Sequence, residues 1–285
     1  MPASDTSIYF AAYHSNAGAY LRGSTGRFRI VEEAIATGEW PYDNGDDPSF
    51  YAARHDALLT WGVCRQDVRN AVKRESVVVF FSYTQRGHKV LYRMSAVATV
   101  SCTLDRRKVF ADSRFDPRDY LNILIRPENG GWRYDETDRR KSARHNKDWL
   151  WRIAVHGRWK EPFAREYERI YRHGWFTNKQ VSIAQNYVVF SELAEKTYIS
   201  PNPPVVATAV AGEHEQWSDH ALKALTVGTA AAYLRNGRNY LRTTNRSGQN
   251  VHPKIRFDMS TGDAVVWRQR VIAALKRSSE RRRPR

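Results

Sequence analysis

The segment from residue 77 to residue 100, VVVFFSYTQRGHKVLYRMSAVATV, constrains the fold of this chain more than any other segment. Two runs of β-branched and aromatic residues flank Gln85-Arg86-Gly87-His88, which predicts a β-hairpin in which Gly87 supplies the positive φ of the turn. The first run, Val77 to Phe81, is apolar without alternation, which indicates a strand covered on both faces. We therefore expect a sheet that lies inside a small barrel or packs against helices.

Other patterns add elements on both sides of the hairpin. We expect strands at residues 8–13, 121–126 and 185–192, and a short basic helix just before residue 77. The proline-rich segment 197–206 is expected to be a loop that no regular element could span.

Two helices are expected near the C-terminus. The first runs through residues 219–236, with Ser218 as its cap and Asn236-Gly237 at its end. The second spans residues 263–277. Its expected buried face consists of Ala264, Trp267, Val271 and Leu275.

These patterns predict a single compact α+β domain over residues 1–277. A helical insertion rich in tryptophan and arginine is expected at about 132–175, and the basic tail 278–285 is expected to be disordered. Apolar residues make up 41% of the 285 residues, which is enough to build a core.

The net charge points to a polyanionic partner. The chain carries 46 Lys+Arg against 30 Asp+Glu, a formal charge of +16. The last ten residues hold six basic residues and one acid, so the rest of the chain keeps a charge of +11. A basic body of this kind favours nucleic acid as a partner.

Several other classes of protein lack support in the sequence. No stretch approaches the ~18 apolar residues of a membrane helix, and the first ten residues lack the pattern of a secretory signal, so a cytoplasmic protein that binds no membrane is expected. Cys64 and Cys102 cannot form a disulfide framework, and no phosphate loop or dinucleotide fingerprint occurs. The acids and histidines of EHEQWSDH fit a helix N-terminus better than a zinc site. No metal and no cofactor are predicted.

The stretch 132–175 holds five of the nine tryptophans among many basic residues. A surface that grips nucleic acid uses this combination, because bases stack on rings while cations neutralise phosphate. The alternative is a pair of amphipathic helices whose tryptophans are core residues, and the sequence favours neither.

The order of elements resembles a known superfamily. The segments IYFAAYHSNAG, LTWGVCRQDVRNAVKRESVVVFFSY and KVLYRMSAVATV resemble the PUA-like superfamily, which includes EVE, ASCH and YTH domains. They are most similar to nucleotide-modification-associated domains of bacterial and phage clusters concerned with modified DNA bases. The resemblance is strongest over residues 58–100. The sequence departs from the family pattern at His14, where an acid is expected, and through the insertion.

This resemblance implies a strongly bent β-barrel with a pocket for a base taken out of its stack. Taken singly, each aromatic residue on the pocket elements fits a core position better, but together they are candidates for stacking on a base. The expected base-binding residues are Tyr9, Tyr13, His14, Asn16, Trp61, Tyr92 and His252.

The same resemblance suggests acid and amide groups for chemistry on a glycosidic bond, which needs a carboxylate and a proton donor. The candidates are Asp119, Asn122 and Glu192, although each also fits a surface charge or a cap. The residues expected to contact the DNA backbone are Arg65, Arg69, Lys73, Arg74, Arg139, Arg140, Lys141 and Arg144.

Three functions remain open. The first is a DNA glycosylase, a hydrolase that flips out a hypermodified cytosine of phage DNA, for example a glucosylated hydroxymethylcytosine, and excises it in antiviral defence. The second is a modified-base reader without chemistry. The third is a PUA-like RNA-binding protein, because shape and charge alone do not choose between nucleic acids.

Overall fold

The computed structural model of this chain describes its strands and C-terminal helices in most detail. The described residues are 5–14, 48–50, 53, 58–62, 65–86, 89–105, 109, 112–115, 126–128, 131–133, 186–210, 213–234, 241, 243–244, 250–251 and 255–280. The chain divides into two compact units. Unit 1 consists of Met1–Asn16, Ala71–Ser101 and Phe190–Arg285, and unit 2 consists of Ala17–Asn70 and Cys102–Val189.

The predicted hairpin forms the centre of the sheet in unit 1. Strand β3 (Val77–Arg86) pairs antiparallel with β4 (Lys89–Asp105), with a register shift between Phe80 and Phe81. Val77 to Phe81 are fully buried, which confirms that this run is covered on both faces.

The remaining strands extend this sheet in both directions. The path through the described strands is β10-β9-β4-β3-β1-β13, and β8 also pairs with β4. Strand β1 runs parallel to β3 and antiparallel to β13, so the sheet is mixed. The bounds are β1 (Asp5–His14), β8 (Thr197–Ile199), β9 (Val205–Val210), β10 (Gln216–Trp217) and β13 (Ile255–Ser260).

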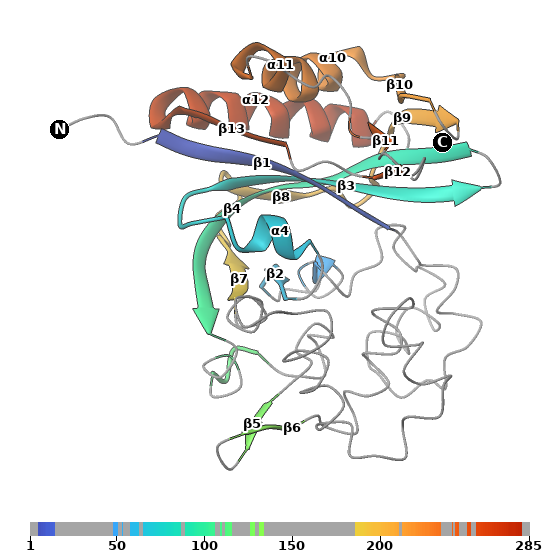
Figure 1. Cartoon of the computed structure of the whole chain (residues 1–285). Helices are drawn as coiled ribbons and strands as arrows, with labels where there is room; N and C mark the ends of the chain where they lie inside the picture. The colour runs from blue at the N-terminus through green and yellow to red at the C-terminus, as the bar shows by residue number, and fades with distance from the viewer. Residues whose placement is uncertain are drawn as a thin grey trace, which may run out of the picture. The chain divides into compact units, whose positions relative to one another are not determined.

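Helices cover one face of this sheet, as Figure 1 shows for α10, α11 and α12 over β1, β3 and β4. Helix α12 (Thr261–Glu280) buries all four residues of its predicted face. The main core lies between these layers and includes Phe10, Phe81 and Phe257, whose rings meet edge to face. Sheet and helices together show a fold of mixed α and β structure, while the strongly bent PUA-like barrel stays a prediction.

The first predicted helix is shorter than expected and differs at its cap. It runs as α10 (His220–Lys223), a π-helical segment (Ala224–Gly228) and α11 (Thr229–Tyr233). Asp219, not Ser218, is the cap, because its carboxylate accepts from the backbone N of Leu222 at 3.0 Å. Leu234 adopts an extended conformation, so the helix ends before Asn236-Gly237.

Two other predictions from the sequence also need correction. The proline-rich segment is not all loop, because β8 occupies its beginning and β9 starts directly after Pro204. The tail does not begin at residue 278, because α12 continues to Glu280. Ser279 is buried there and its hydroxyl lies 2.7 Å from that of Ser200.

Unit 2 contains short strands and a small core. Strand β2 (Thr60–Trp61) pairs antiparallel with β7 (Asn186–Phe190), which confirms the predicted strand at 185–192. The hydroxyl of Tyr187 donates to that of Thr60 at 2.7 Å. The basic helix is a single turn, α4 (Gln66–Arg69).

Four short strands form two separate ladders, β5 (Arg126–Glu128) with β6 (Gly131–Arg133) and β11 (Thr243–Thr244) with β12 (Asn250–Val251). The strand predicted at 121–126 and the insertion at 132–175 lie almost entirely outside the described residues. The expectation of one domain over 1–277 stays a prediction. Within the described part of the chain, no helix is long and apolar enough to cross a membrane.

Candidate functional site at the 191–196 turn

One of the predicted catalytic acids, Glu192, lies in a turn that hydrogen bonds fix at both ends. This segment, called here the 191–196 turn, follows β7 and leads into β8. The backbone N of Ser191 donates to the carbonyl of Thr99 at 2.8 Å. Inside the turn, the carbonyl of Leu193 accepts from the backbone N of Lys196 at 2.8 Å and of Thr197 at 2.9 Å. Glu192 is exposed between these contacts.

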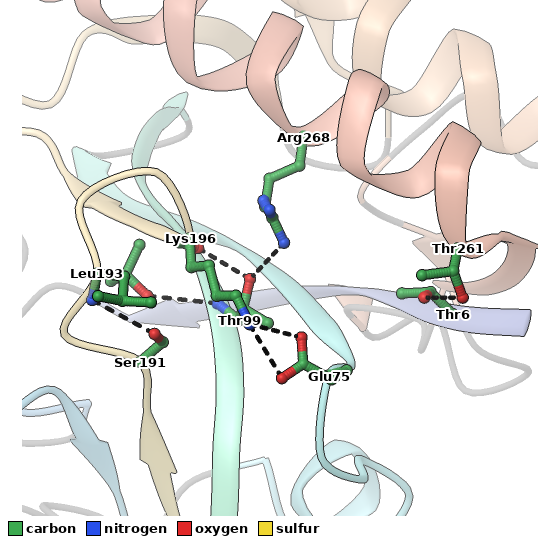
Figure 2. Close-up of polar contacts among 9 residues, drawn as sticks. Thr6, Glu75, Thr99, Ser191, Leu193, Lys196, Thr261 and Arg268 are labelled. Atoms are coloured by element: carbon green, nitrogen blue, oxygen red, sulfur yellow. Dashed lines mark hydrogen bonds and ion pairs between the residues drawn. The ribbon is translucent and has the colours of Figure 1, made fainter. Parts of the chain in front are cut away.

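Thr99, on β4, is the residue to which the turn is attached. Its carbonyl accepts from the first residue of the turn, and its hydroxyl donates to the carbonyl of the last residue, Lys196, at 2.9 Å. Its backbone N also donates to the Lys196 carbonyl, at 3.1 Å. Every hydrogen-bonding group of this buried threonine therefore contacts the turn, as Figure 2 shows in part.

A buried arginine contacts Thr99 from the helix side. Arg268 extends from α12 toward the sheet (Figure 2), is 6% exposed, and donates from Nη1 to the Thr99 hydroxyl at 3.1 Å. Burial lowers the pKa of its guanidinium, and the negative charges of Glu75 and Glu195 oppose this shift. Its buried Nε has no hydrogen-bond partner among the described residues.

An ion pair holds the outer side of the turn. Lys196 Nζ lies 3.1 Å and 3.0 Å from the two carboxylate oxygens of Glu75. Glu75 has a φ of 66°, in the left-handed region that a residue with a side chain seldom adopts. Its backbone N donates to the carbonyl of Val100 at 2.9 Å. The backbone of Glu75 is thus bonded to β4 in the unusual conformation from which its carboxylate reaches Lys196.

The hydrogen bonds of the 191–196 turn thus fix the backbone on both sides of Glu192 and leave its carboxylate exposed. A fixed carboxylate can stabilise developing positive charge or accept a proton from water. The described residues include no group of three or more His, Cys, Asp or Glu that could hold a metal ion.

The structure places two of the predicted base-binding residues in the core of unit 1. Tyr9 is fully buried, and its hydroxyl donates to the carbonyl of Ala71 at 2.9 Å. Tyr92 is fully buried in the main core beside Tyr83. Phe10 belongs to that same core, so strand alternation places Tyr9 on the opposite face of the sheet from Tyr92. The two rings cannot stack on one base, which corrects that expectation.

Other predicted base-binding residues are placed less completely. Trp61, in unit 2, is 1% exposed and is a core residue. Tyr13 and His14 belong to β1, but their side chains are not described. The remaining predicted site residues lie outside the described residues: Asn16, Asp119, Asn122, Arg139, Arg140, Lys141, Arg144 and His252.

The predicted basic helix contributes fewer exposed cations than expected. Arg69 is 2% exposed, because the single turn of α4 turns it inward together with Val68, so it presents no charge to a DNA backbone. Arg65 forms an ion pair with Asp67 at 2.9 Å. Lys73 and Arg74 are exposed, as expected.

The sequence interpretation missed two sets of residues. The first is Thr99, Glu75 and Arg268. A signal existed for Arg268, because it follows Ala264 by four positions and precedes Val271 by three, which is the spacing of the buried face of α12. The second set is the exposed cations of α12. They are Arg270, Lys276 and Arg277, of which Lys276 and Arg277 were counted only within the basic last ten residues.

Comparison of this chain with protein-family models, with curated proteins and with solved structures gives no match.

Proposed function

We propose that this protein binds DNA, extrudes a modified base and cleaves its N-glycosidic bond. The observation that carries the proposal is the exposed carboxylate of Glu192 on a turn bonded to Thr99 at both ends. The net charge of +11 outside the last ten residues supports the polyanionic partner. The resemblance to nucleotide-modification-associated domains supports the modified base.

The chemistry assigned to Glu192 follows from what the bond needs. As the bond between the base nitrogen and C1′ breaks, positive charge develops on the sugar, and a nearby carboxylate stabilises that charge. Water then adds to C1′ and gives one proton to the carboxylate, which releases it to solvent, while the departing base takes up one proton from solvent at its nitrogen. The products are a free base and an abasic site.

The pocket for the extruded base is proposed to come from a PUA-like closure of the sheet. Extrusion costs a few kcal/mol and needs a stacking or hydrogen-bonding partner to offset it. Because Tyr9, Trp61 and Tyr92 are buried, this role passes to the other candidates. They are Tyr13, His14, Asn16 and His252.

Contacts to phosphate are assigned to exposed cations. Lys73 and Arg74 are exposed in the segment that precedes β3, and the exposed cations of α12 add to them. Phosphate contacts position the duplex and carry no sequence information. The preference for a modified base therefore has to come from the pocket.

The test is an excision assay on phage DNA that carries glucosylated hydroxymethylcytosine. The unaltered protein is expected to generate abasic sites, and Glu192→Gln to abolish them while DNA binding remains, because the amide keeps the shape but loses the charge. Glu213→Gln removes another exposed glutamate and serves as the matched control.

Each alternative corresponds to a distinct outcome. Intact DNA under conditions where the protein binds it would contradict excision and identify a modified-base reader. Stronger binding to RNA than to modified duplex DNA, in competition at fixed salt, would contradict both DNA functions.

A further inference from the structure

We propose that Arg268 is a positioning residue, which acts through the hydroxyl of Thr99 to fix the 191–196 turn and thereby the carboxylate of Glu192. The inference rests on the proposed function for the role of Glu192. The mechanical part of the inference, that Arg268 and Thr99 hold the turn, stands on contacts within unit 1 alone.

The first step of the argument concerns the direction of the Thr99 hydroxyl. A threonine hydroxyl has one hydrogen to donate and two lone pairs with which to accept, whereas a guanidinium only donates. Because Arg268 Nη1 lies 3.1 Å from this oxygen, the hydroxyl accepts from Arg268. Its single hydrogen is then directed to the Lys196 carbonyl, 2.9 Å away. Arg268 therefore selects the one hydroxyl orientation that holds the turn.

The second step concerns why an arginine occupies this place. An arginine stays charged in a protein, so burying its guanidinium is unfavourable without compensating charge and acceptors. The negative charges of Glu75 and Glu195 act on Arg268. Glu195 belongs to the turn itself, and Glu75 forms the ion pair with Lys196. Movement of the turn away from β4 would remove the carboxylate of Glu195 from the buried cation. The attraction between Arg268 and Glu195 thus favours the position of the turn seen in the structure.

The third step links the held turn to the reacting group. Glu192 directly follows Ser191, whose backbone N is bonded to Thr99, and directly precedes Leu193, whose carbonyl accepts two bonds within the turn. Its backbone therefore moves little while these bonds persist. A misplacement of about 1 Å in a reacting group can lower a rate on the order of a hundredfold. Loosening the turn is expected to affect the chemical step more than DNA binding.

Each variant for the test changes one functional group and keeps the size of the side chain as nearly as possible. Thr99→Val removes the hydroxyl and keeps the shape, and Thr99→Ser keeps the hydroxyl. Arg268→Met removes the guanidinium and keeps a long apolar chain in the core. Thr226→Val is the matched control, because it removes a buried hydroxyl whose donation to Leu222 at 2.6 Å has no part in the turn.

Two measurements are made on each folded variant. The first is amide hydrogen exchange of Ser191, Lys196 and Thr197, which reports opening of the turn without reference to any activity. Thr99→Val and Arg268→Met are expected to raise this exchange by about tenfold, which is the effect of losing a hydrogen bond to a charged or buried group. Thr99→Ser and Thr226→Val are expected to leave it unchanged.

The second measurement is the single-turnover rate of base excision together with the dissociation constant for the same DNA. Thr99→Val and Arg268→Met are expected to lower the rate by roughly ten- to a hundredfold. The dissociation constant is expected to stay unchanged, and Thr99→Ser to restore the rate. Unchanged exchange of the turn in Arg268→Met would overturn the role of Arg268, and unchanged exchange in Thr99→Val would overturn the route through the Thr99 hydroxyl. If the unaltered protein excises no base, the proposed function fails, and the exchange data alone decide whether Arg268 holds the turn.

Discussion

At the scale of single residues, burial decides which of the predicted functional side chains can act. Composition and strand patterns identify Tyr9 and Tyr92 as aromatic residues on central strands, but they do not tell which face each ring occupies. The neighbouring strand and helix determine that, and both rings are in the core. Arg268 is the opposite case, a charged residue that is buried. From the sequence it resembles a surface residue, and only its spacing from Ala264 and Val271 places it on the buried face of α12.

Tyr9 gives a prediction about stability and pH. Tyr9→Phe is expected to lower the free energy of unfolding by about 1 kcal/mol at neutral pH, because the bond from its hydroxyl to the Ala71 carbonyl is lost. Burial raises the pKa of Tyr9 above 10.0, against the opposing charge of Arg256. Below pH 10 this contribution is present in full, and it is lost as the pH rises through the raised pKa of the folded state.

Urea unfolding at pH 7 to 11 measures this effect, with Tyr233→Phe, at a half-exposed tyrosine, as the control. The difference in unfolding free energy between the unaltered protein and Tyr9→Phe is expected to shrink above pH 10. A difference that stays constant to pH 11 would contradict the assigned pKa shift.

At the scale of elements, the sequence predicts existence and type better than boundaries and pairing. The hairpin, the strand of β7 and the buried face of α12 follow from local patterns, and all three are confirmed. The proline-rich segment 197–206 differs from the predicted loop because pairing of β8 and β9 with β4 outweighs the low strand preference of its prolines. Proline carbonyls still accept, and that of Pro204 accepts from the backbone N of Met94 at 3.2 Å. The 191–196 turn could not be predicted as a unit, because its partners lie about 95 residues earlier and 75 residues later in the chain.

The cap of α10 provides the prediction at this scale. Asp219→Ala is expected to lower the unfolding free energy by about 1 to 2 kcal/mol, because Asp219 caps the helix through one carboxylate oxygen and accepts from the Ser278 hydroxyl at 2.8 Å through the other. Asp219→Asn is expected to cost less, since asparagine also caps helices well. The control is Ser218→Ala, which removes a hydroxyl that donates to the Val206 carbonyl at 3.2 Å and does not cap the helix, and it is expected to lower the free energy by at most about 1 kcal/mol. A larger cost for Ser218→Ala than for Asp219→Ala would contradict the assignment of the cap.

At the scale of the whole chain, unit 1 is assembled from segments that are distant in sequence. Strand β1 lies between β3 and β13, so residues 5–10 pair with residues 255–260 at the other end of the chain. Helix α12 also contacts segments that are distant in sequence. The hydroxyl of Thr6 donates to that of Thr261 at 3.4 Å (Figure 2), and the hydroxyl of Ser200 lies beside that of Ser279. Hydrophobic periodicity carries no information about which distant strands pair, and for this reason the sequence predicted β1 and β3 without their order and did not predict β13.

The charge at the C-terminal end belongs to the same scale, because the proposed DNA partner would be attracted by net charge and not by one defined residue. Removal of residues 281–285 deletes four arginines, and we expect DNA affinity to fall to a similar extent for modified and unmodified duplexes. The slope of log affinity against log salt should decrease by about 0.9 for each phosphate that the shortened protein no longer neutralises. Replacement of the same arginines by lysine keeps the charge and should keep the slope. Titrations at several salt concentrations measure both quantities. A selective loss of binding to modified DNA in the shortened protein would show instead that these arginines help to read the base.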